Sequence, residues 1–198
     1  PDIYNPRYSY GGGKILTELM GIHYGKKFFK KLIIFRPHNV YGPDMGFEHV
    51  IPQFCMKLLD KARTKGNDFD FQIQGTGRET RAFCFIDDAV NGLTATLDHC
   101  EQCVGEIFNI GTDICITTGE GIEIVENIIG EKALISNEPR RIGDQLKTHA
   151  NIGKARRILG YNPTTSAEDG LRNEVEWYQE NIFEKIDLKN FHFHTIFN

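Results

Sequence analysis

Apolar residues along the chain follow helical spacing in some segments and form short extended runs in others. Ile15, Leu19 and Ile22 share one helical face and predict a helix over 15–25, and the β-branched run at 31–35 predicts a buried strand. The same reasoning predicts further helices over 50–62, 87–99, 117–130, 151–159 and 167–182. It predicts further extended segments over 69–73, 81–86, 106–111 and 132–136. Because helices and strands alternate throughout, the pattern predicts an α/β fold.

The composition is that of an ordinary globular protein of 198 residues, with 40% hydrophobic and 25% charged residues. The net charge of -4 gives no reason to expect a nucleic-acid or membrane surface, and no apolar run is long enough to cross a bilayer. Five scattered cysteines favour a reducing compartment, so a cytoplasmic protein is expected. The turn-rich start at Pro1, without an initiator methionine, predicts that the chain is a fragment.

Tyr10 and Lys14 lie four residues apart, with three glycines between them. If this segment is helical, both side chains project from one face. A nearby ammonium favours the phenolate form of a tyrosine, so the pair can accept a proton from a sugar or alcohol hydroxyl while hydride leaves the carbon. The glycines cost a helix up to about 1 kcal/mol each, but they would let a cofactor approach closely. The alternative is that 8–13 is a loop and both residues lie on the surface.

Cys100 and Cys103 form a C-x-x-C in the segment expected to join a helix to a strand. A redox pair and half of a zinc site are the two functional interpretations, and chance spacing is the alternative. No second C-x-x-C or H-x-x-x-H follows in the sequence, so a metal is not expected.

Several further motifs follow the Tyr10–Lys14 pair in order. Glu18 lies four residues beyond Lys14. The later segments are FRPHNVYGP at 35–43, HVIPQF at 49–54, IQGTGRETRAFCFIDDAV at 73–90, FNIGTDICITTGE at 108–120, RIGDQ at 141–145 and KARRILGYNPTTSAEDGL at 154–171. From about residue 6 to 178, the sequence thereby resembles the extended short-chain dehydrogenase/reductase family, specifically its NAD-dependent nucleotide-sugar epimerases and dehydratases.

The resemblance implies a partial Rossmann-like parallel sheet, its second half, together with a small α/β substrate-binding domain. It assigns 1–48 and 82–112 to the C-terminal part of the NAD-binding Rossmann domain. It assigns 49–81 and 113–182 to the nucleotide-sugar-binding domain and leaves 183–198 as a tail. The family's G-x-x-G-x-x-G phosphate loop does not occur before Tyr10, so this chain alone is expected to bind NAD poorly.

On the cofactor side, the resemblance implies that Tyr10 is the catalytic base. Lys14 would tune Tyr10 and hold a ribose hydroxyl of NAD. Arg36 and Pro37 would shape the nicotinamide side of the cleft. His38 is expected to be a packed loop residue rather than an acid or base.

On the substrate side, the resemblance implies a site for a nucleotide-diphosphate sugar. Arginine suits such a site because its planar fork can make paired hydrogen bonds to phosphate oxygens. Arg81 and Arg141 match the phosphate and nucleotide contacts, and Asn39 matches a donor to the diphosphate or the sugar. Val50 and Ile51 would pack against the nucleotide base, and Gln74 is a weaker candidate for a substrate contact.

Two alternatives concern the arginines. Arg81 could form a surface salt bridge to Glu79 or Asp88, and Asp88 is otherwise expected to cap a helix and to orient Arg81. Arg140 competes for the role given to Arg141.

The implied function is an NAD-dependent nucleotide-sugar epimerase or dehydratase that acts by transient oxidation at the sugar C4. A homodimer is implied as well, packed through the helix that carries Tyr10 and Lys14. Two alternatives are an NADPH-dependent carbonyl reductase of the same superfamily and a truncated, non-catalytic binding module. The two arginines favour the sugar enzyme, because a small carbonyl substrate needs no diphosphate site.

Overall fold

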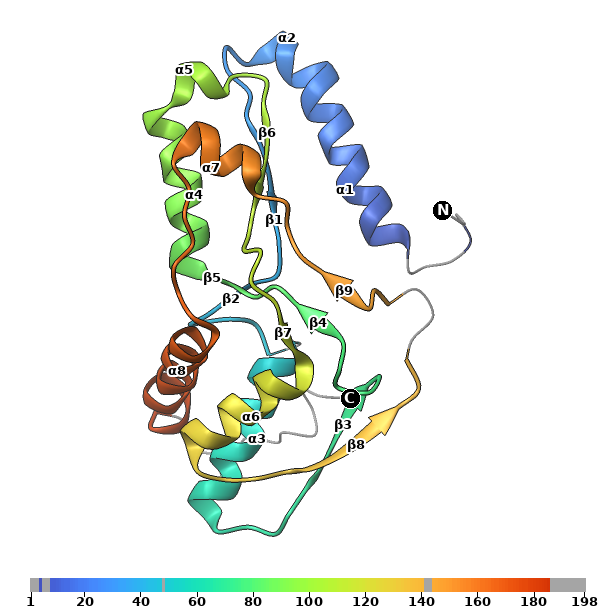
Figure 1. Cartoon of the computed structure of the whole chain (residues 1–198), viewed down its shortest axis with the longest axis vertical. Helices are drawn as coiled ribbons and strands as arrows, with labels where there is room; N and C mark the ends of the chain where they lie inside the picture. Colours follow the sequence, from blue (N-terminus) through green and yellow to red (C-terminus); the bar gives the residue numbers. More distant parts are fainter. Residues whose placement is uncertain (1–3, 5–7, 48, 141–143, 186–198) are drawn as a thin grey trace.

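The strands of this chain pair in four separate small groups (Figure 1). The structure, a computed structural model, describes residue 4 and residues 8–47, 49–140 and 144–185. Three parallel pairs join β1 (Ile34–Pro37) to β6 (Ile107–Ile110), β2 (Val40–Tyr41) to β5 (Cys84–Phe85), and β3 (Asp70–Gln74) to β8 (Leu134–Glu138). A fourth group places β4 (Thr80–Arg81) between antiparallel β7 (Ile116–Thr117) and parallel β9 (Lys147–Thr148). This parallel pairing confirms the predicted α/β class.

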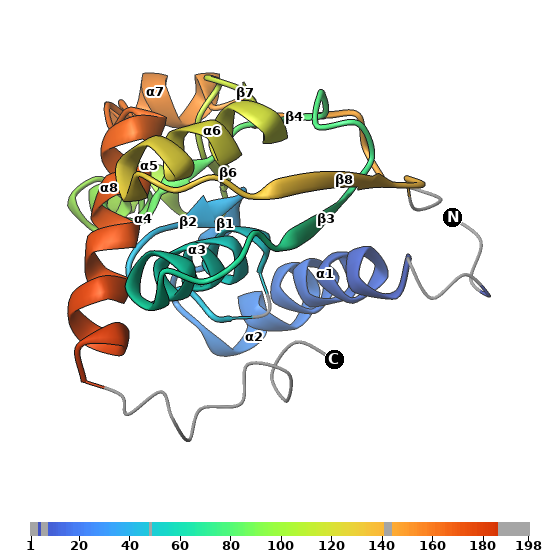
Figure 2. The ribbon, with the colours of Figure 1, turned by 90° about the horizontal axis from the view of Figure 1, so that it is seen from below.

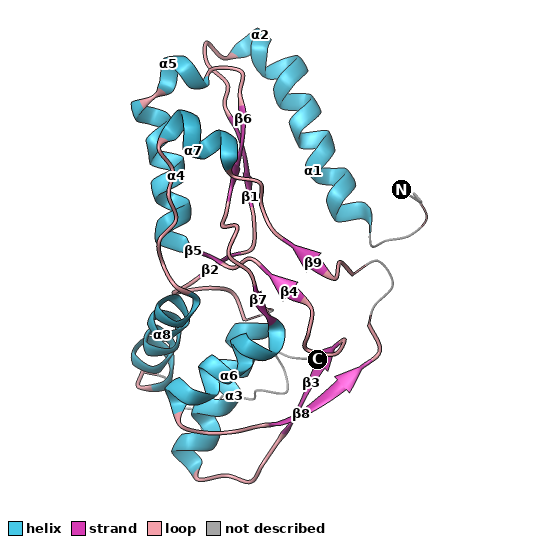
Figure 3. Ribbon diagram, viewed as in Figure 1, coloured by secondary structure: helices cyan, strands magenta, loops and turns pink. Residues whose placement is uncertain are grey.

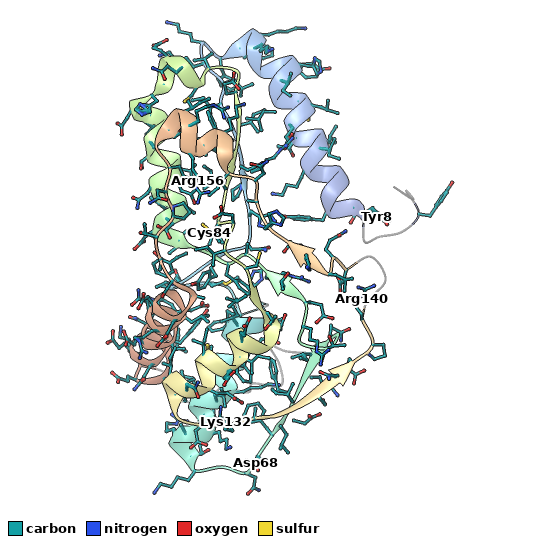
Figure 4. The ribbon with its side chains drawn as sticks, in the orientation of Figure 1. Tyr8, Asp68, Cys84, Lys132, Arg140 and Arg156 are labelled. Atoms are coloured by element: carbon teal, nitrogen blue, oxygen red, sulfur yellow. The ribbon has the colours of Figure 1, made fainter. Side chains whose placement is uncertain are left out.

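One half of the molecule is built on β1 and β6. The helices α4 (Ile86–Asp98) and α7 (Gly153–Leu159) pack against this pair, and α5 (Cys100–Cys103) lies at its end (Figure 1). Alternate residues of β6 are buried, as expected for a strand covered by helices. The interior cluster of this half consists of Cys84, Ala89, Cys103, Phe108, Ile110, Ala150, Ile152, Ala155, Leu159 and Tyr161. Cys84, one member of this cluster, is labelled in Figure 4.

The other half packs α3 (Val50–Thr64), α6 (Thr118–Ile129) and α8 (Ala167–Tyr178) together, with β3 and β8 at one side (Figure 1). Local sequence explains the helix ends. Thr117 and Glu120 form a capping box at the start of α6, and Gly130 ends the helix in a left-handed conformation with φ 81°. Ser166 accepts the Asp169 N–H at the start of α8. The apolar cluster between these helices is centred on Phe54, Met56, Leu58, Phe71, Val125, Leu171 and Tyr178.

The helix α1 (Ser9–Met20) projects at one side of the molecule (Figures 1 and 2). It contributes no buried residue to the described structure. It continues into a π-helical turn, η2 (Gly21–Gly25), and then into α2 (Lys26–Phe28). A second π-helical turn, η3 (Gln179–Phe183), ends α8. Among the described helices, none combines the length and the apolarity that a bilayer crossing requires.

The predicted elements mostly form, but several bounds and short elements differ (Figure 3). The helix predicted over 15–25 begins earlier, at Ser9, and its last five residues are π-helical. The run 81–86 is not one strand, because β4 and β5 join different sheets and Ile86 begins α4. The C-x-x-C lies in a short helix, α5, rather than in a loop. The two-residue strands β2, β7 and β9 carry no sequence period, so only tertiary pairing reveals them.

Candidate active site

Tyr10, Lys14 and Glu18 follow one another at four-residue intervals along α1. Lys14 Nζ lies 5.3 Å from the centroid of the Tyr10 ring, so the two side chains meet on one face of the helix. Tyr10 is 75% exposed. The helical placement of this pair is therefore confirmed, and the alternative that 8–13 is a loop is wrong. Their catalytic roles stay a prediction.

The three glycines between Tyr10 and Lys14 lie inside the helix. A Cβ added at Gly11, Gly12 or Gly13 would meet no described atom within 4 Å. The backbone between the two functional groups is thus open to a flat ligand, which is the arrangement expected if a dinucleotide lies against this helix. The exposed phenol, the adjacent ammonium and this uncovered backbone fit NAD.

Glu18 ties α1 to the first strand. Arg36 of β1 donates from Nε to Glu18 Oε1 at 2.7 Å and from Nη2 to Glu18 Oε2 at 2.6 Å. This paired hydrogen bond holds the pKa of the Glu18 carboxyl below its usual range, against the opposing effect of desolvation. Pro37 is the last residue of β1 and lies opposite Ile110. The Glu18–Arg36 contact therefore fixes the helix that carries Tyr10 against the strand that carries the residues predicted to face the cofactor.

Asn39 and Arg81 are brought together by a residue that the sequence did not single out, Thr148. Asn39 adopts a left-handed conformation with φ 45°, and its amide donates to Thr148 Oγ1 at 3.1 Å. Thr148 is the register partner of Arg81 across β4 and β9. The half-buried Arg81 donates from Nη1 to the carbonyl of Thr80 at 2.9 Å. Thr148 thus accepts the Asn39 amide through its hydroxyl and pairs with Arg81 through its backbone.

The carboxylates considered as partners of Arg81 are bonded elsewhere. Glu79 accepts the backbone N–H of Thr76 at 3.1 and 3.2 Å. Asp88 accepts the backbone N–H groups of Thr164 and Thr165 at 3.2 and 3.0 Å. Asp88 therefore joins α4 to the segment before α8, and the prediction that it orients Arg81 is wrong. The sequence could not reveal this contact, because its two partners lie more than seventy residues away.

The remaining predicted contacts are dispersed over the second half of the molecule. Val50 begins α3 and is exposed, whereas Ile51 is partly buried against the apolar cluster. Gln74 is exposed at the end of β3, opposite Glu138 of β8. Arg141 lies outside the described residues, and Arg140 beside it is exposed (Figure 4).

His38 lies between the cofactor residues and Asn39. Its Nδ1 is buried and finds no hydrogen-bond partner among the described residues. Burial, and then the nearby His149, lower the pKa of His38, so its imidazole is held in the neutral form. His38 lies in a loop and is partly buried, which agrees with the prediction of a packed loop residue.

Two surface depressions lie away from the Asn39–Arg81 pair. One, of about 490 Å³, is lined by the residues of α1, η2 and α2 that point outward: Leu16, Leu19, Met20, His23, Tyr24 and Lys27. The other, of about 610 Å³, lies between the start of α6 and strands β3 and β8. In the described part of the chain, no three His, Cys, Asp or Glu side chains gather as a metal site would require.

Comparison with known proteins matches the chain to one family. The model of the NAD dependent epimerase/dehydratase family covers residues 1–111. The chain is 33% identical over 177 residues to the uncharacterized UDP-glucose epimerase YtcB of Bacillus subtilis, a match that covers 87% of this chain and 52% of that protein. The chain thus spans about half the length of the curated relatives that it matches.

Solved structures give the same result. UDP-glucuronic acid 4-epimerase of Bacillus cereus, in complex with UDP-glucuronic acid and NAD, superposes with a TM-score of 0.77 at 30% identity. That match covers 86% of this chain and 52% of the epimerase. DesIV of Streptomyces venezuelae, a dTDP-glucose 4,6-dehydratase with NAD and TYD bound, gives a TM-score of 0.75 at 30% identity. That match covers 87% of this chain and 51% of the dehydratase. The order of motifs, the parallel strands and these matches agree, and the chain belongs to the NAD-dependent epimerase/dehydratase family.

Proposed function

We propose that this chain supplies the catalytic base and the nucleotide-sugar site of an NAD-dependent nucleotide-sugar epimerase or dehydratase. The observation that carries the proposal is the approach of Lys14 Nζ to within 5.3 Å of the Tyr10 ring centroid, on an exposed helical face. The solved relatives support the choice of ligands, since one holds UDP-glucuronic acid with NAD. A dTDP-glucose dehydratase among them, also with NAD, supports keeping both reaction types.

In the proposed reaction, Tyr10 accepts the proton of the sugar C4 hydroxyl. The ammonium of Lys14 lies beside the phenol that performs this step, and Lys14 would also donate to a ribose hydroxyl of the cofactor. Bound NAD would supply the reversible hydride-transfer chemistry that oxidation at C4 requires. The open backbone at 11–13 admits the cofactor to the face of α1. Arg36 and Pro37 line the nicotinamide side, with Arg36 held in place by Glu18.

The diphosphate of the substrate is assigned to Asn39, Arg81 and Arg141. A guanidinium carries five N–H donors, so the single hydrogen bond of Arg81 to Thr80 is compatible with additional bonds to phosphate oxygens. The contact of Asn39 with Thr148 would hold its amide beside Arg81. The nucleotide base is assigned to Val50 and Ile51 in the first turn of α3, with Gln74 at the edge of the same site.

Three wider assignments belong to this proposal. Residues 1–48 and 82–112 would form the cofactor-binding part, 49–81 and 113–182 the substrate-binding part, and 183–198 a tail. The chain would form a homodimer through α1, which exposes Leu16, Leu19 and Met20 beside the depression described above. A cytoplasmic location rests on cysteine usage, and all five thiols are free.

Thermal unfolding with a ligand panel tests the substrate class. UDP, GDP or dTDP should raise the Tm, whereas simple ketones should not, because only a diphosphate engages Arg81. Arg81→Gln should abolish the nucleotide-dependent rise. Arg78→Gln, an exposed arginine on the preceding turn, is the matched control and should retain it.

The same panel separates the alternatives. Stabilisation by NADPH and ketones, without any effect of nucleotides, would favour a carbonyl reductase. Nucleotide binding without turnover of UDP-, GDP- or dTDP-sugars, even with NAD added in excess, would favour a binding module. Product analysis by mass and by chromatography distinguishes dehydration, which changes the mass, from epimerisation, which does not.

A further inference from the structure

The two cysteines of the C-x-x-C lie on one helical turn. Cys100 and Cys103 are the first and last residues of α5. Residues three apart in an α-helix have Cα atoms about 5 Å apart, from the rise and radius of the helix. Disulfides bridge Cα atoms separated by about 4.4–6.8 Å. The backbone of α5 therefore holds the Cα atoms of the two cysteines at a separation that a disulfide accepts.

The two thiols have different surroundings. Cys103 is fully buried in the cluster that contains Phe108, whereas Cys100 is partly exposed. Burial raises the pKa of the Cys103 thiol, with Cys100 and Glu106 adding to the rise. A buried protonated thiol beside an accessible one is the arrangement of a resolving cysteine and an attacking cysteine.

A lysine lies next to the accessible thiol. Lys31, just before β1, forms an ion pair with Glu101 of α5. The ion pair therefore places the ammonium of Lys31 at the residue that follows Cys100. The contact between α5 and this segment is fixed by the backbone, because Gly105 N–H donates to the Leu32 carbonyl at 2.7 Å.

We propose that Cys100 and Cys103 are a dithiol pair that is reversibly oxidised by small disulfides such as glutathione disulfide. The Cys100 thiolate attacks one sulfur of the small disulfide, forms a mixed disulfide and releases one small thiolate. The Cys103 sulfur then attacks Cys100, forms the Cys100–Cys103 bond and releases the second small thiol, which carries the proton of Cys103. Two protein thiols are oxidised, and one small disulfide is reduced to two thiols.

The test is equilibration of the chain in glutathione buffers of increasing oxidised fraction, followed by acid quenching, alkylation and peptide mass spectrometry. The wild-type chain should accumulate a Cys100–Cys103 bond and little mixed disulfide. Cys103→Ser should trap one glutathione on Cys100. Cys115→Ser is the matched control, because Cys115 is exposed, and should still form the Cys100–Cys103 bond. Modification confined to Cys115 would overturn the proposal.

A rate measurement tests the role of the lysine. In the Cys103→Ser background, Lys31→Met should slow glutathione addition to Cys100 by roughly three- to tenfold, because the thiolate loses its cation. Lys30→Met, which changes the neighbouring exposed lysine, should leave the rate unchanged. Equal rates in the two variants would contradict the proposed role of Lys31, and the absence of glutathione addition to Cys100 in both would contradict Cys100 as the attacking thiol. Far-UV circular dichroism of every variant establishes that the fold is retained.

Discussion

Two helices of equal length, α1 and α8, are built in opposite ways. Each has twelve residues, but α1 has no buried residue within the described structure. The buried positions of α8 are Gly170, Leu171, Glu174, Val175 and Tyr178. Tertiary packing normally supplies most of the stability of a helix. The comparison indicates that α8 serves the core of this chain, whereas the surface of α1 is available for contacts outside it.

Each helix also has features that are unusual in a globular protein. In α1 three consecutive glycines weaken the helix, and its apolar side chains face outward. In α8 the carboxylate of Glu174 is completely buried, and neither oxygen has a hydrogen-bond partner in the described part of the chain. The departures in α1 coincide with the proposed catalytic pair. The departure in α8 lies in the core, so it should affect stability rather than activity.

The largest expected effect comes from Tyr10→Phe, which removes the proposed base from the exposed helix. Turnover of a nucleotide sugar with NAD should fall by roughly 10²–10⁴-fold, the usual contribution of general base catalysis. The Tm should change little, because Tyr10 is 75% exposed. Steady-state kinetics and thermal unfolding measure the two effects.

Tyr8→Phe is the matched control for this substitution. Tyr8 is also exposed and lies just before α1 (Figure 4), but it is outside the Tyr10–Lys14 pair. Its replacement should leave turnover within about twofold of the unchanged chain. Equal losses of turnover in the two variants would contradict the proposal that Tyr10 is the catalytic base.

The next effect concerns Glu174 of α8. Burial raises the pKa of this carboxyl from 4.5 to about 8. The folded state keeps the proton while the unfolded state loses it, so the free energy of unfolding falls as the pH rises from 4.5 to about 8. Each pKa unit corresponds to about 1.4 kcal/mol, so the loss is on the order of 5 kcal/mol.

Glu174→Gln should remove most of this pH dependence. Urea unfolding at pH 8.5 should show a variant more stable than the unchanged chain by a few kcal/mol, with a small difference at pH 5. Glu176→Gln changes an exposed carboxyl of the same helix and should leave the pH dependence in place. A pH-independent free energy of unfolding in the unchanged chain would show that Glu174 is paired or hydrated in solution.

The sequence predicted α6 and α8 closely because their signals are local. Thr117 with Glu120 and Ser166 with Asp169 begin these helices, and apolar spacing marks their buried faces. For α1 the three glycines obscured the start of the helix, because glycine is a poor helix former at any position. The four-residue interval from Tyr10 to Lys14 nevertheless gave the correct geometry.

The candidate substrate site was predicted only in part. Asn39 and Arg81 were identified from motifs, but their connection through Thr148 depends on the pairing of β4 with β9. Two-residue strands have no period that a sequence can display. The unpaired state of Glu174 was also beyond prediction, because its helical position is compatible with a buried or an exposed face until the partner helices are known.

The Glu18–Arg36 contact, which joins α1 to β1, should contribute modestly to the free energy of unfolding. A double-mutant cycle with Glu18→Gln and Arg36→Gln should give a coupling energy of about 0.5–1 kcal/mol, because the pair is bidentate but partly exposed. Arginine lowers the pKa of Glu18 from 4.5, so this coupling is complete above pH 4.5 and is lost as the pH falls through the lowered value. The exposed Glu168–Arg172 pair of α8 should give a smaller coupling.

The smallest expected effect concerns Gly12, and it separates the stability of α1 from its proposed function. Gly12→Ala adds a methyl group that meets no described atom within 4 Å, so α1 should gain up to about 1 kcal/mol of helix stability. If a cofactor lies against this backbone, the same methyl group should raise the KM for NAD severalfold. Gly121→Ala, inside α6, is a control for the effect of alanine in a helix remote from Tyr10, because the added methyl group would meet only Ile116 Cδ1 at 3.6 Å. A variant with a more stable α1 and an unchanged KM for NAD would contradict the proposal that the cofactor lies against the backbone at 11–13.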